Sequence, residues 1–177
     1  MSMTQIAFLR KADIPTNKQI QDTIQKLGYD FKILSGLEKQ IGQDGLDCSI
    51  DGHQTYFETY VDVAKNAISE NEADWITPDI TNQDTAISFI WGADFAAGAC
   101  IGLISTALTD LSNALVYYMD DQMKYTREML LADTPQFLEE LNKQKDRTLK
   151  QQEVSRPAQT NLQTKNTFWD RLKKLFK

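Results

Sequence analysis

The chain has 177 residues and a formal net charge of −6, with 41% hydrophobic and 25% charged residues. This length and composition are typical of one globular domain with a hydrophobic core, and they exclude a disordered or collagen-like chain. The longest apolar stretch, 95–109, is bounded by Asp94 and Asp110 and is too short to be read as a membrane span.

The charges are distributed unevenly along the chain. Residues 1–142 contain nine basic and 22 acidic residues, a net charge of −13, whereas residues 143–177 contain ten basic and three acidic residues, a net charge of +7. An acidic body lacks the clustered lysines and arginines that neutralise phosphates, so we expect no nucleic-acid binding. It favours a basic protein as partner.

The N-terminus and the cysteines indicate the compartment. Residues 1–16 lack the basic region, apolar run and small-residue cleavage site of a secretory signal, which predicts a cytoplasmic protein. Cys48 and Cys100 are far apart in the sequence and form neither a CxxC pair nor a zinc-type spacing. We therefore expect two separate, unpaired thiols that behave as buried small hydrophobic residues, as suits a reducing environment.

The first half of the chain begins with an apolar strand at 5–10. Thr16 and Gln19 have the spacing of a capping box, and Gly28 stands where a C-terminal cap is expected, so a helix is predicted over 16–28. A strand with alternating burial follows at 29–34. Asp51-Gly52 predicts a tight hairpin between strands 46–50 and 54–63, and the polar stretch 64–84 is expected to be a long exposed loop that contains at most one helical turn.

The second half continues with a strand at 85–91. Asp94 is the expected N-cap of a helix that ends near residue 112, and Gly98 and Gly102 would let that helix approach a sheet or another helix closely. Residues 114–119 have the composition of a strand, although a continued helix is the alternative. Thr126 and Thr134-Pro135 resemble helix starts, which predicts short helices at 127–132 and 135–149.

Together these elements predict an α+β fold. We expect a mostly antiparallel sheet of about five or six strands with two main helices, 16–28 and 94–112, packed on it as a ferredoxin-like βαββαβ variant, followed by C-terminal helices and a tail. The predicted organisation is an acidic α+β globular domain at 1–149, a polar linker at 150–165 and a basic amphipathic C-terminal segment at 166–177.

The sequence offers little material for catalysis. His53 is the single histidine and lies beside the Asp51-Gly52 turn, where we expect it to be exposed; a Cys48-His53 pair would lack a third, orienting group. The run FIWGADFAAGACIG lacks both GxGxxG and the Lys-Ser/Thr ending of a phosphate-binding loop, and Asp94 is better explained as a cap than as an acid. We expect no enzyme activity, no cofactor and no metal site.

Protein binding is the interpretation that remains. Strand alternation sends Phe57 to one face of the sheet and Tyr56 and Tyr60 to the other, and an exposed aromatic face would be an interface; the sequence leaves open which face that is. The acidic loop and turn are the predicted contact residues for a basic partner: Glu70, Glu72, Asp74, Trp75, Asp79, Asp120 and Asp121.

The C-terminal sequence NTFWDRLKKLFK forms an apolar helical stripe opposite basic side chains. Docking on the acidic body is the favoured role, with binding to a partner and attachment to an anionic membrane surface as alternatives. The stripe consists of Phe168, Trp169, Leu172, Leu175 and Phe176.

The general pattern of residues 5–132 resembles a known group of proteins. The resemblance is carried by DGLDCSIDG leading to FETY, by FIWGADFAAGACIGLISTAL, and by ALVYYMDD, YTREMLL and the aromatic-basic tail. Together they are similar to small cytoplasmic proteins of bacterial polymorphic or contact-dependent toxin systems, some of which are immunity proteins. The resemblance implies a role in neutralising a cognate toxin by occlusion, and it assigns no functional residue. An accessory protein recruited through its C-terminal segment is the alternative function.

Overall fold

The computed structural model describes residues 2–155, with side chains up to residue 147. Among the described residues, 2–143 form one compact unit, and a second unit begins at Gln144. In chain order the elements of the first unit are β1 (Met3–Leu9), a 3₁₀ turn η1 (Lys11–Asp13), α1 (Asn17–Lys26), β2 (Phe31–Ile33), β3 (Leu46–Ile50), β4 (His53–Val63), α2 (Ala64–Glu70), η2 (Asp74–Asp79), β5 (Thr85–Trp91), α3 (Phe95–Ser112), β6 (Leu115–Tyr118), β7 (Met123–Tyr125) and the start of α4 (Arg127–Ser155).

The seven strands form one antiparallel sheet in the order β2-β3-β4-β5-β1-β6-β7. Its centre, β4-β5-β1-β6, together with α1 and α3, is the predicted βαββαβ arrangement, since β1 lies between β5 and β6. The β2–β3 pair extends this core at one edge and β7 at the other, which gives seven strands where five or six were expected. The α+β prediction is confirmed.

Local signals in the sequence explain where the main elements begin and end. The Thr16 capping box is present, and Asp94 Oδ1 accepts from the Ala96 amide at 2.9 Å. Asp51 and Gly52 both have positive φ, 48° and 78°, as a type I′ hairpin turn requires. Asn113 ends α3 in the left-handed region at φ 52°, so the alternative of a helix continuing through 114–119 is excluded.

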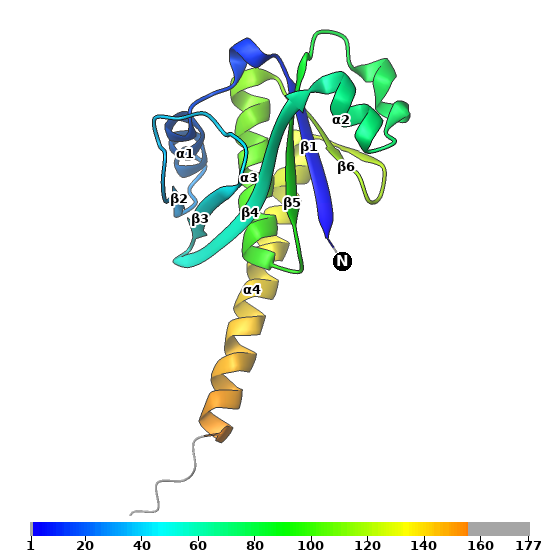
Figure 1. Cartoon of the computed structure of the whole chain (residues 1–177). Coiled ribbons are helices and arrows are strands. Elements are labelled where there is room, and N and C mark those ends of the chain that lie inside the picture. The colour runs from blue at the N-terminus through cyan, green and yellow to red at the C-terminus, as the bar shows by residue number, and fades with distance from the viewer. Residues whose placement is uncertain (1, 156–177) are drawn as a thin grey trace, which may run out of the picture. The chain divides into compact units, whose positions relative to one another are not determined.

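The first face of the sheet carries the larger hydrophobic core. Side chains from β1, β4 and β5 such as Leu9, Phe57 and Phe89 are buried there among residues of α1 and α3. Figure 1 views the sheet from the other face, so β4, β5 and β1 lie in front of α3. Within residues 2–155, α3 is the one helix long and apolar enough to span a membrane, and 78% of it is buried. Its apolar composition is therefore that of a core helix.

The start of α4 corrects the prediction of two short helices. Pro135 lies inside a continuous helix. The helical turn around it packs closely against α3, because a Cβ on Gly98 would lie only 2.7 Å from the Phe137 ring and a Cβ on Gly102 only 3.4 Å from Thr134 Oγ1. This packing holds the helix together around the proline. The two glycines thus allow one helix to approach another. α4 also includes residues 150–155, which were predicted as the beginning of the linker.

The second face is covered over part of its area by residues 64–80. The sequence predicted an exposed loop here, which is wrong: α2 and η2 bury Ala64, Ala67, Ile68 and Ile76 against Ile6, Phe8, Ala86 and Tyr117 of the sheet. The buried residues of α2 are mostly small, so their periodicity is weak in the sequence. We call α2, η2 and the short turn between them the helical cap, residues 64–79.

Candidate protein-binding surface

The predicted acidic contact residues of 70–79 lie on the helical cap. Glu70, Glu72 and Asp74 are exposed, and no lysine or arginine within the described part of the chain lies within ion-pair distance of them. Trp75 is about one-third exposed and packs edge-on against Tyr117, with ring centroids 5.5 Å apart. This part of the predicted surface therefore presents carboxylates without basic partners among the described residues, next to the partly buried ring of Trp75.

Asp79 has a structural role. Its Oδ2 accepts hydrogen bonds from Tyr117 Oη at 2.7 Å and from Lys124 Nζ at 2.8 Å. The Lys124 bond, followed by that of Tyr117, lowers the pKa of Asp79, and burial together with this carboxylate raises the pKa of Tyr117. Asp79 therefore fastens the helical cap to the β6–β7 hairpin.

The second predicted acidic pair occupies the turn of that hairpin. Asp120 Oδ2 accepts from the Thr4 amide at 3.0 Å, which ties the turn to the start of β1. Asp121 is exposed and, among the described residues, is without a basic partner. Asp79 thus binds the β6–β7 hairpin whose turn contains Asp120 and Asp121. The predicted C-terminal stripe, 168–176, lies outside the described residues.

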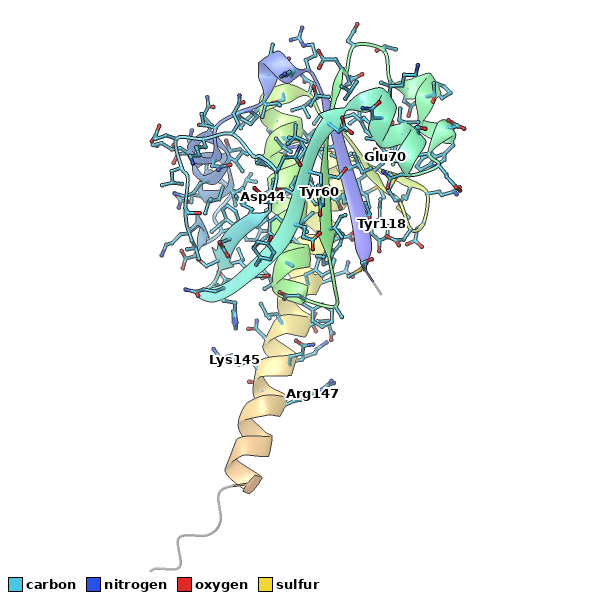
Figure 2. All side chains as sticks on the ribbon, in the orientation of Figure 1. Asp44, Tyr60, Glu70, Tyr118, Lys145 and Arg147 are labelled. Atoms are coloured by element: carbon cyan, nitrogen blue, oxygen red, sulfur yellow. The ribbon has the colours of Figure 1, made fainter. Side chains whose placement is uncertain are left out.

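The uncovered part of the second face carries two exposed tyrosines. Tyr56 and Tyr60 on β4 are 52% and 45% exposed, whereas Phe57 between them is 1% exposed. The sequence left open which aromatic face of the sheet is exposed. It is the face of Tyr56 and Tyr60, because α1 and α3 cover the face that Phe57 occupies. Figure 2 shows Tyr60 on β4 at the face turned toward the viewer.

Both tyrosine rings are held in place. The Tyr56 hydroxyl donates to the Asp44 carbonyl oxygen, and its ring lies directly over Gly45. Gly45 has φ 111°, and a Cβ there would overlap the Tyr56 ring, so only glycine fits. Tyr60 Oη donates to Glu58 Oε2 at 2.8 Å. These contacts reduce the rotamer entropy that the rings would lose on binding a partner.

Carboxylates surround the two tyrosines. Glu58 follows the same side of β4, and Asp47 on β3 is the cross-strand neighbour of Tyr56. The hydrogen bond to Glu58 and the charge of Glu58, followed by burial, raise the pKa of Tyr60, and the charge of Asp44 acts in the same direction as the smallest cause. Within the described residues, none of these acids has a basic partner within 4.0 Å. We call this surface the tyrosine face: Asp44, Asp47, Tyr56, Glu58 and Tyr60.

Sequence reasoning named the tyrosines of this surface and missed its acids. The available signal was the period of two: Glu58 lies two residues from both Tyr56 and Tyr60, so all three must share a face. The position of Asp44 on this surface could not be predicted from the sequence, because it depends on how loop 42–45 runs along β4. Thr59 Oγ1 of β4 holds that loop by donating to the Gly42 carbonyl oxygen at 2.7 Å.

The two cysteines are neighbours in the core, which corrects the expectation that they are separate. Cys48 on β3 and Cys100 on α3 are both buried and not disulfide-bonded. Contact with the Cys100 thiol, followed by burial, raises the pKa of Cys48 well above its usual range, so its thiol stays protonated at neutral pH. His53 is half-buried and pairs with Ile50 across the hairpin, and Asp94 caps α3 while accepting from Thr55 Oγ1 at 2.6 Å.

Within the described residues, no three His, Cys, Asp or Glu side chains lie together in a way that could hold a metal ion. No family model matches the chain, and comparison with curated proteins and with solved structures finds no significant match. The tyrosine face and the free carboxylates of the helical cap lie on the same face of the sheet and together form the candidate protein-binding surface.

Proposed function

We propose that the chain is a specific protein-binding module, an immunity protein that neutralises a cognate bacterial toxin in the cytoplasm by occluding a basic surface of it. The observation that carries this proposal is the exposure of Tyr56 and Tyr60 on a rigid strand among unpaired carboxylates. Tyrosine is enriched at the centres of interfaces, because it supplies a large contact area with few rotatable bonds.

The charges around the tyrosines specify the partner. Acids on the tyrosine face and on the helical cap give this side of the sheet a negative potential, which accelerates encounter with a basic protein and disfavours acidic ones. The resemblance to immunity-like proteins supports a toxin as that basic protein. In this arrangement Glu70, Glu72, Asp74 and Trp75 form the rim of the interface, and the tyrosines form its centre.

The test uses the product of the gene adjacent to the one encoding this chain. We expect it to bind the full-length chain in calorimetry, and we expect Tyr56→Ala/Tyr60→Ala to weaken binding at least a hundredfold, since two hot-spot side chains of about 2 kcal/mol each are removed. Leu34→Ala/Leu111→Ala is the matched control, because these side chains are similarly exposed, at 45% and 41%. Co-expression should restore growth for the wild type and the control only.

Two results would contradict the proposal. The first is an adjacent gene product that does not bind, together with native cells that yield no stoichiometric partner. The second is equal weakening by the tyrosine pair and by the control pair, which would place the interface elsewhere. A fall in association rate with rising salt is expected, because steering between exposed charges is screened over about 10 Å at 0.1 M salt.

A further inference from the structure

A second surface feature lies on the other face of the sheet from the tyrosine face. It is a pocket of about 140 Å³ where the ends of β1 and β5 and the β6–β7 hairpin meet α3 and the start of α4. Four aromatic rings and one carboxylate line it, and we call three of these rings together with the carboxylate the aromatic pocket: Trp91, Tyr118, Tyr125 and Asp133. Met3, Leu130 and Phe137 complete its apolar wall.

The three rings form a continuous wall in which neighbours are strongly tilted. Trp91 and Tyr118 have ring centroids 6.1 Å apart at an interplanar angle of 43°, and Tyr118 and Tyr125 are 6.3 Å apart at 81°. Because the planes differ in this way, the wall offers π faces as well as ring edges. The π faces of tryptophan and tyrosine attract cations that come within about 6 Å of the ring centroid.

The charges around the pocket are negative. Asp133 lines it, and no described lysine or arginine lies within ion-pair distance of that carboxylate. Burial, then the neighbouring Asp133, raises the pKa of Tyr125 to about 12, and burial with the charges of Asp120 and Asp121 raises the pKa of Tyr118. The one lysine of the hairpin, Lys124, is engaged by Asp79 on the opposite face.

The pocket also contains a residue with an incomplete hydrogen bond. Trp91 is 93% buried, as its exposed fraction is 7%, and among the described residues its Nε1 has no acceptor. Buried N–H groups without acceptors are rare in native proteins. The wall of the pocket therefore includes a tryptophan with one polar atom that packing leaves without a partner among the described residues.

We propose that the aromatic pocket binds an arginine side chain of a protein partner. The guanidinium group is planar, stacks on aromatic faces and forms paired hydrogen bonds with a carboxylate, here that of Asp133. Tyr118 and Tyr125 contact the cation, and Trp91 closes the wall. This site goes beyond the proposed function, because it needs no toxin and lies on a different face from Tyr56 and Tyr60.

The experiment titrates the full-length, ¹⁵N-labelled chain with N-acetyl-arginine amide and with N-acetyl-citrulline amide, its uncharged analogue. The signal is the indole N–H resonance of Trp91, assigned by its loss in Trp91→Phe. We expect the arginine compound to shift this resonance with an affinity in the millimolar range and the citrulline compound to bind at least about fivefold more weakly. Asp133→Asn should reduce the arginine affinity to that of citrulline.

The matched control is Glu139→Gln, which removes a carboxylate from the same helix, α4, outside the pocket. Equal binding of arginine and citrulline, an unshifted Trp91 resonance, or equal effects of Asp133→Asn and Glu139→Gln would each overturn the proposal. If Asp133→Asn does not fold, Tyr118→Leu replaces it; this variant keeps an apolar wall, loses a π face, and should weaken arginine binding about two- to fivefold. Unchanged affinity in that variant would also refute the site.

Discussion

The two faces of the sheet differ in how far packing within the fold explains which residues they carry. On the first face the large side chains beneath α1 and α3 are buried, so packing explains why these residues are apolar. On the second face the helical cap covers Ile6, Phe8 and Tyr117 but leaves Tyr56 and Tyr60 exposed. Packing explains the buried residues on both faces, but it does not explain the exposed Tyr56 and Tyr60. Residues that packing does not require are therefore the better evidence for function.

Adjacent residues on β4 give the sharpest way to break this comparison. Phe57→Ala removes a ring that packs against Phe89 at 6.1 Å, and we expect a loss of about 3–5 kcal/mol in the free energy of unfolding. Tyr56→Ala should cost about 1 kcal/mol or less, because the side chain is exposed. Urea denaturation of both variants tests this; similar losses would show that the second face is also a packing surface.

The glycine beneath Tyr56 gives the next largest effect. Gly45→Ala places a methyl group against the Tyr56 ring at a backbone angle that disfavours it, and we expect a loss of about 2–3 kcal/mol. Gly42→Ala is the control, since a Cβ there has no heavy atom within 4 Å. Thermal unfolding compares the two variants. If they are equally stable, the position of Tyr56 is not fixed by Gly45.

The contact between α3 and α4 can be tested with two glycines of one helix. Gly98→Ala forces the Phe137 ring to move, whereas Gly102→Ala meets ordinary contact distances and gains helix propensity. We expect Gly98→Ala to be less stable than Gly102→Ala by about 1–2 kcal/mol. Denaturant unfolding measures the difference, and the reverse order would argue against the close approach of these helices.

The smallest effect concerns the attachment of the helical cap. Because Lys124 and Tyr117 lower the pKa of Asp79 in the folded state, Asp79 contributes stability above the unfolded pKa, near 4, and loses that contribution as the pH falls through the folded value. The stability difference between wild type and Asp79→Asn should therefore shrink in acid. Unfolding curves measured from neutral pH to pH 3 test this. A constant difference would mean that ionised Asp79 does not hold the cap.

Local sequence signals predicted the parts of the fold that depend on near neighbours. The Thr16 capping box, the Asp51-Gly52 turn and the Asp94 cap each lie within a few residues of the groups they bind, and all three are confirmed. Pro135 inside α4 was mispredicted because a distant contact, from Phe137 to Gly98, decides it. Long-range packing overrides local preference at such positions.

The candidate surface was predictable in the same partial way. Alternation along β4 separates Phe57 from Tyr56, but the choice of buried face depends on α3, which lies some 40 residues further along. The contact between Cys48 and Cys100 escaped the sequence for the same reason. The helical cap was missed because alanines form much of its buried side, and small residues give a weak periodic signal.

The sheet ends at both edges in a strand of only three residues, β2 and β7, and each has a lysine at its centre, Lys32 and Lys124. Strands this short offer few free backbone groups, and a charged side chain at the centre of each edge disfavours pairing with a second copy. Recruitment of a partner by strand addition is therefore disfavoured. The molecule can display an open, tyrosine-bearing sheet face without that sheet becoming a template for its own aggregation.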